Sequence, residues 1–171
     1  MYFVSTIYSL KKNCSIKMEK IEEQIKTQFY KAFEDLLTES LSSDTPNWEW
    51  LVRLYKELRD RICNLTPRRT DIHGELYENM DAELFEQMVT NGAFRGQEMW
   101  NLVDYVFSLI KQREAPARNA STSEILQELQ ELLQQSTTSI ATFVPVFLRK
   151  AHQKIDEIDN DKKEFLKQFK K

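Results

Sequence analysis

The fold is decided by residues 81–119, which read DAELFEQMVTNGAFRGQEMWNLVDYVFSLIKQREAPARN. Asp81 can cap a helix because its carboxylate accepts hydrogen bonds from the free N–H groups of the first turn. Asn91 and Gly92 predict the end of that helix, since glycine readily adopts the left-handed conformation of a C-terminal cap. Apolar residues then recur at helical spacing over about residues 96–113, until Pro116 stops the pattern. This stretch therefore predicts two capped helices and a fixed turn, with no reactive group placed for chemistry.

The same periodicity extends over most of the chain. Apolar residues at three- and four-residue steps predict further helices over about residues 15–41, 46–65, 71–80, 122–133 and 140–158. Sheets need many turns, and the sequence has only three Gly and four Pro. We therefore predict an all-α fold, a single-domain bundle of about six to seven helices. Residues 1–17 are expected to be a flexible leader, residues 18–160 the helical domain, and residues 161–171 a Lys-rich tail.

Three details of these helices are specific enough to check. Thr45 is expected to cap the second helix, with Pro46 at its first position. The segment from Ser121 to Glu124 has the spacing of a capping box. Pro145 lies inside the last pattern, which predicts one kinked or shifted helix.

Charge is unevenly distributed along the chain. The formal net charge of -3 provides no bulk attraction to nucleic acid. From Asp71 to Trp100 there are seven acidic residues and one basic residue, Arg95. Basic residues gather around the Pro67 turn and in the tail, where they are either ordinary surface charge or contacts for a partner or for phosphates. These basic residues are Arg59, Arg61, Arg68, Arg69, Lys162, Lys163, Lys167, Lys170 and Lys171.

The sequence offers little for catalysis. Its only histidines are His73 and His152, and neither follows a Glu at the spacing of a di-iron bundle. Cys63 precedes His73 by ten residues without the surroundings of a nucleophile–base pair. No phosphate-binding glycine loop or zinc-type cluster is present. We therefore expect a non-enzymatic protein without a cofactor or metal, and two reduced cysteines of a cytoplasmic or nuclear protein.

Arg118 is singled out by its position just after the proline turn. In a structural role, Arg118 would pair with Asp81 or Glu83 through bidentate hydrogen bonds. The alternative is an arginine displayed for an anionic ligand. We favour the structural role, because a partly buried arginine is normally paired.

The succession of elements resembles the T-complex protein 11 family. The resemblance runs from about Trp50 to Phe165, through the Asp81 helix, Gly92-Ala93-Phe94, the long apolar helix and Ala115-Pro116-x-Arg118. Glu114 departs from the family pattern, which has Cys there, and so does Asn119, where Asp is usual. The resemblance implies an all-helical, non-enzymatic regulator, linked in animal and fungal members to cyclic-AMP and protein-kinase-A signalling. It marks Asp81, Pro116 and Arg118 as motif residues and supplies no catalytic residue.

Two functional hypotheses follow. The first is a helical interaction protein that binds and regulates a protein partner. The alternative is a nucleic-acid-binding or nucleus-targeted effector, of a kind that a virus could encode, which uses the basic residues. Three Trp and ten Phe exceed what one small core readily hides, so self-association is also expected.

Overall fold

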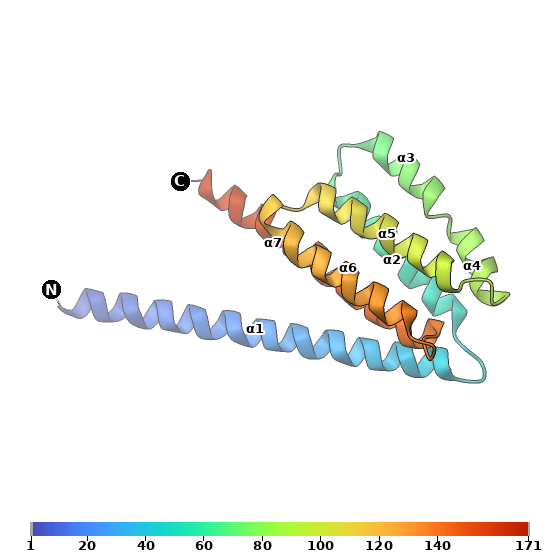
Figure 1. Cartoon of the computed structure of the whole chain (residues 1–171). Helices are drawn as coiled ribbons and strands as arrows, with labels where there is room; N and C mark the ends of the chain where they lie inside the picture. Colours follow the sequence, from blue (N-terminus) through green and yellow to red (C-terminus); the bar gives the residue numbers. More distant parts are fainter. Residues whose placement is uncertain (1, 171) are drawn as a thin grey trace. The chain divides into compact units, whose positions relative to one another are not determined.

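The computed structural model describes the backbone of residues 2–170 and the side chains of residues 15–170. Within these residues the chain consists of helices joined by short connections and contains no strand, so the all-α prediction is confirmed (Figure 1). None of these helices is long and apolar enough to cross a membrane. The elements are α1 (Tyr2–Ser42), α2 (Trp48–Leu65), α3 (Thr70–Asn79), α4 (Ala82–Thr90), α5 (Gly96–Arg113), the 3-10 turn η1 (Pro116–Arg118), α6 (Asn119–Gln134) and α7 (Ile140–Gln168).

The chain divides into two compact units inside α1. One unit ends at Leu36 and the other begins at Leu37. The first unit is therefore made of α1 alone, whereas the second contains the last turns of α1 and the helices α2 to α7. The segment that the sequence marks as a leader is helical from residue 2 onward.

The core of the second unit forms where α2, α5 and α7 meet. α2 packs against α3, α4, α5 and α7, α5 also packs against α6 and α7, and α6 packs against α7. The Phe107 ring of α5 lies 6.2 Å from the Phe147 ring of α7, which lies 6.4 Å from Phe143. All three rings are fully buried, and each contributes about 1.5–3 kcal/mol through the apolar area it removes from water.

The helix ends around α4 and α5 are confirmed. The Asp81 carboxylate accepts hydrogen bonds from the backbone N–H groups of Glu83 at 2.9 Å and Leu84 at 3.1 Å. Gly92 has a φ of +68°, in the left-handed region that a C-terminal cap needs. α5 spans Gly96–Arg113, the predicted range.

Two predicted helix starts are wrong. α2 begins at Trp48, and its cap is Asn47, whose side-chain oxygen accepts from the backbone N–H of Trp50 at 3.0 Å. Thr45 and Pro46 therefore precede the helix, since asparagine is at least as good a cap as threonine. The predicted capping box at Ser121 is absent because α6 already begins at Asn119.

The chain places its capping box at the start of α7 instead. The Ser139 hydroxyl and the Thr142 side chain satisfy each other's backbone N–H groups there. α7 continues through Pro145, so the prediction of one helix across this proline is confirmed, and the kink or shift stays a prediction. The last helix is longer than its apolar pattern, because Ile158 is its last buried residue and the helix continues to Gln168.

The apolar stripe of α1 lies mostly on the surface. Of its residues only Leu37, together with Leu41 one turn later, belongs to the core. The large apolar side chains of α1 that remain exposed are Ile16, Met18, Ile21, Ile25, Phe29 and Leu36. Other exposed large apolar side chains of the described residues are Tyr77, Leu84, Phe165, Leu166 and Phe169, while Trp48, Trp50 and Trp100 are half-buried.

Candidate functional site

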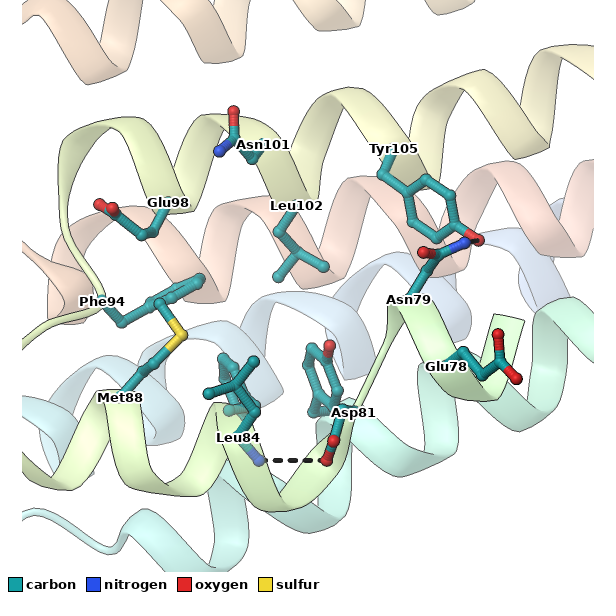
Figure 2. Close-up of a pocket in the computed structure, with 12 residues that line it drawn as sticks. Glu78, Asn79, Asp81, Leu84, Met88, Phe94, Glu98, Asn101, Leu102 and Tyr105 are labelled. Carbon is teal, nitrogen blue, oxygen red and sulfur yellow. Dashed lines mark hydrogen bonds between the residues drawn. The ribbon is translucent and has the colours of Figure 1, made fainter. Parts of the chain in front are cut away.

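A pocket opens between α4 and α5 in the second unit (Figure 2). Leu102 and Tyr105 of α5 lie on one side of it, and Leu84 and Met88 of α4 lie on the other. Phe94, in the connection between these helices, closes one end. The Asp81 and Gly92 caps position this pocket, because they fix where α4 begins and ends.

The floor of the pocket is aromatic. The rings of Tyr55 from α2 and Phe85 from α4 stack with centroids 4.0 Å apart. Phe94 meets Phe85 edge-on at 5.1 Å. Burial raises the pKa of the Tyr55 hydroxyl above its ordinary value, so this ring stays neutral and the floor stays apolar.

The rim of the pocket is acidic. Glu78 and Asp81 lie at one side and Glu98 lies at the start of α5 (Figure 2). Glu75, Glu83 and Glu86 are exposed on the same pair of helices, α3 and α4. At the far end the Asn79 side chain donates to the Tyr105 hydroxyl at 3.3 Å. The pocket therefore presents an apolar floor inside a negative field.

The size of the pocket limits its ligand. Its volume is about 220 Å³, below the roughly 300–1,000 Å³ of pockets that enclose a small molecule or cofactor. It suits one or two side chains of a larger partner. Leu84 is exposed at its edge, where a partner would cover it.

The arginines around the Pro67 turn do not form one exposed patch. Arg59 is buried, donates from Nη1 to the Met80 carbonyl oxygen at 3.0 Å, and lies over the Tyr77 ring at 3.9 Å. It thereby holds α3 and the edge of the pocket against α2. The expectation that Arg59 is displayed for a partner needs correction, because its guanidinium points into the fold.

The other arginines predicted to contact a partner differ in their exposure and in their hydrogen bonds. Arg61 donates to His152 Nδ1 at 2.8 Å and to Asp156 at 2.7 Å, so it joins α2 to α7. Arg69 is exposed but pairs with Asp71 through two hydrogen bonds of 3.0 and 2.8 Å. Arg68 is exposed beside it.

The Lys-rich tail continues α7 as an exposed helix. Lys162 donates to the Leu65 carbonyl oxygen and Lys167 pairs with Glu164 at 2.6 Å. Lys163 and Lys170 are exposed, and Lys171 lies outside the described residues. Phe165 and Phe169 meet edge-on at 4.8 Å on the same exposed segment.

Arg118 forms the bidentate pair that was predicted, but its partner is neither Asp81 nor Glu83. Its Nε and Nη2 atoms donate to the two carboxylate oxygens of Asp161 at 3.1 and 2.9 Å. Asp161 lies on α7, so the arginine holds the turn after Pro116 to α7 and not to the Asp81 helix. The pairing keeps the pKa of Asp161 below its ordinary value.

A buried ion pair lies beside that turn. The Glu114 carboxylate accepts from the Thr122 hydroxyl at 2.7 Å and lies 3.4 Å from Lys154 Nζ of α7. Lys154 also contacts Glu157 at 2.5 Å. The carboxylate and ammonium groups are almost completely removed from solvent. Glu114, which departs from the family pattern, therefore anchors η1 and α6 to α7.

Cys63 and the two histidines lie apart, each in its own surroundings within the described residues. Burial raises the pKa of the Cys63 thiol, so the reactive thiolate is disfavoured. His73 lies 2.8 Å from the Thr66 carbonyl oxygen through Nε2. Burial, together with the neighbouring Arg61, lowers the pKa of His152 to about 4.

Comparison with known proteins defines the class of this helical protein. The family model described as T-complex protein 11 matches residues 8–161. The chain therefore belongs to the T-complex protein 11 family, as its motif residues suggested. The match begins within the first turns of α1, well before the Trp50 start of the sequence resemblance.

The chain is also similar to a human protein of that name. The chain is 28% identical over 121 residues to the T-complex protein 11 homolog of Homo sapiens. That alignment covers 66% of this chain and 24% of the human protein, so the chain spans about a quarter of the relative's length. No solved structure matches the chain.

Of the site residues predicted from the sequence, Asp81 alone lines the pocket, although Phe94 was part of the quoted family motif. The excess of acidic residues from Asp71 to Trp100 signalled the rim. The floor gave no such signal, because Tyr55, Phe85 and Phe94 meet only when α2 and α4 pack. An aromatic residue on a helix stripe reads as ordinary core until its neighbours are known.

Proposed function

We propose that this protein is a non-enzymatic helical interaction protein that regulates a protein partner by holding part of it at the α4–α5 pocket. The observation that carries the proposal is an apolar floor of stacked aromatic rings inside an acidic rim. Interfaces take most of their binding energy from a few side chains that fill such pockets. The small volume favours an anchoring side chain of a macromolecule over a whole small molecule.

The chemistry of the site indicates the chemistry of its partner. The floor takes an apolar side chain, and the carboxylates of Glu78, Asp81 and Glu98 favour Lys or Arg beside it. Complementary charge of this kind raises the association rate and selects among partners. Membership of the family is consistent with a regulatory role, and the link to cyclic-AMP and protein-kinase-A signalling is retained as a prediction about the partner's pathway.

Selection from a random peptide library on the immobilised full chain tests this proposal. The expected peptides carry an apolar residue flanked by Lys or Arg, and their binding weakens as salt screens the rim. Leu84→Lys should abolish binding, since it places a cation and removes an apolar contact at the pocket. Leu166→Lys is the matched control, because Leu166 is an equally exposed leucine on the tail. Peptides that bind both variants alike, or that are acidic, would contradict the proposal.

The nucleic-acid alternative is tested separately by a gel-shift titration against salt. Phosphate contacts need outward-facing cations, and Arg68, Lys163 and Lys170 are the exposed candidates. The burial of Arg59 and the pairing of Arg61 weigh against this alternative. Binding that falls steeply with salt supports it, and no binding at low salt removes it.

A further inference from the structure

The first unit carries an apolar face that its own helix cannot cover. Met18, Ile21, Ile25, Phe29 and Leu36 are each between 52% and 67% exposed. They follow one side of α1, because steps of three, four and seven residues return nearly to the same line on a helix of 3.6 residues per turn. Helices in proteins gain most of their stability by burying such a face. We therefore expect a face of this length to pack against another apolar surface.

The spacing of the stripe is symmetric about Thr27. Ile25 and Phe29 each lie two residues from Thr27, and Met18 and Leu36 each lie nine residues from it. In an antiparallel pair related by a two-fold axis at Thr27, Met18 lies opposite Leu36 of the second copy. Ile25 likewise lies opposite Phe29. A two-fold interface is self-complementary in this way, since each residue of a pair meets the other across the axis.

Side-chain size agrees with that register. Ile21 lies on the same flank of the stripe as Ala32, three turns later, and the two-fold axis brings these positions to within one residue of each other, about 1.5 Å of helix rise. The large side chain is thus received by a small one, as packed helices require. A parallel pair would instead place Phe29 against Phe29 and Ala32 against Ala32, which leaves one crowded layer and one gap.

The charges that border the stripe also fit the antiparallel register. Lys17 and Asp35 are eighteen residues apart, five full turns, so both border the stripe on one flank. An antiparallel two-fold pair sets each flank against the same flank of its partner. Lys17 then faces Asp35 of the second copy, offset by two residues or about 3 Å of helix rise. The pair occurs twice, once at each end of the interface.

We propose that residues 15–36 of α1 form a docking surface for the same segment of a second copy, in an antiparallel pair centred on Thr27. The proposal is independent of the α4–α5 pocket. It assigns the exposed stripe of the first unit to self-association, whereas the pocket belongs to the second unit.

Sedimentation of the full chain over a range of concentrations tests the pairing. The expected species has twice the 20.3 kDa mass of one chain. Ile25→Glu and Phe29→Glu should each weaken dimerisation about tenfold or more, because each loses an apolar contact twice per dimer. Ile16→Glu is the matched control: Ile16 is exposed on the opposite side of α1, so this variant should dimerise like the wild type. A monomeric wild type, or unchanged dimerisation of both stripe variants, would overturn the proposal.

Cysteine cross-linking tests the register. In a background with Cys14→Ser and Cys63→Ala, Met18→Cys and Leu36→Cys chains are mixed and treated with a short bis-maleimide. The antiparallel register predicts cross-links between the two different chains and few within either variant alone. Strong cross-linking of Met18→Cys to itself would establish a parallel pair and overturn the register.

Circular dichroism measures whether the glutamate variants keep the folded second unit. The glutamate variants change exposed positions of α1, so the thermal transition of the second unit should stay unchanged. A variant that loses its dimer while keeping that transition supports the stripe as the interface. Loss of the dimer only in parallel with loss of that transition would contradict it.

Discussion

Arg118 and Asp161 are joined by two parallel hydrogen bonds, of 3.1 and 2.9 Å, although 43 residues separate them in the chain. The planar guanidinium matches the carboxylate, so the contact fixes an orientation as well as a distance. It ties the turn that begins at Pro116 to the last third of α7. Both side chains remain more than a third exposed, so water weakens the pair.

Arg118→Lys is expected to lower the free energy of unfolding by about 0.5–1 kcal/mol, measured by urea denaturation. Lysine keeps the charge but loses the bidentate geometry. Asp161→Asn and the double variant complete a double-mutant cycle. A coupling energy near zero would show that the pair contributes nothing to stability. Because the pKa of Asp161 is lowered in the folded state, its contribution is present above about pH 4 and is lost as the pH falls through the folded pKa.

Lys154→Met is expected to be more costly, at about 3–5 kcal/mol, because it strands the buried Glu114 carboxylate. Lys154 and Glu114 have side chains only 2% and 0% exposed. The matched control is Lys154→Met with Glu114→Gln, which removes both charges and should recover most of the loss. A double variant as unstable as the single one would mean that packing, and not the charge pair, sets the cost. Unfolding in urea at neutral pH provides the comparison.

Local chemistry explains which parts of this fold could be predicted. Asp81, Gly92 and the ends of α5 depend on interactions within a few residues, so the sequence contains all that determines them. The same holds for the choice of an all-α fold. The start of α2 was misplaced because Asn47 and Thr45 are both good caps, and only the conformation of the connection decides between them.

Contacts between distant segments could not be predicted in this way. Arg118 was expected to pair with Asp81 or Glu83, and nothing in the spacing identified Asp161 on α7. Arg59 was grouped with surface cations because its burial depends on Tyr77 of α3 and on Met80, which follows that helix. The stripe on α1 has the pattern of a core helix, since periodicity shows that a face is apolar without showing what covers it.

Asp81→Ala is expected to destabilise the protein by about 1 kcal/mol, because the first backbone N–H groups of α4 lose their acceptor. It should also weaken peptide binding at the pocket, since α4 forms one side of it and Asp81 lies on the rim. Thermal or urea unfolding and peptide titration measure the two effects.

Asp81→Asn keeps a side-chain oxygen that can cap α4 and removes the negative charge. Its side-chain oxygen can still accept from Glu83 and Leu84, so stability should remain close to that of the wild type. Affinity for a basic peptide should still fall, because the rim loses one negative charge. Equal affinity of Asp81→Asn and the wild type would remove this carboxylate from the proposed recognition.

His152 should make the protein lose stability in mild acid. Its pKa is about 4 in the folded state because it is buried beside Arg61, against about 6.5 in an unfolded chain. Between these values the unfolded chain binds a proton that the folded chain does not, so stability falls as the pH falls through this window. The loss approaches about 3 kcal/mol at the acid end. His152→Gln, which can still accept from Arg61, should flatten the pH dependence of the urea midpoint between about pH 6.5 and 4, and an unchanged slope would assign the acid sensitivity to other groups.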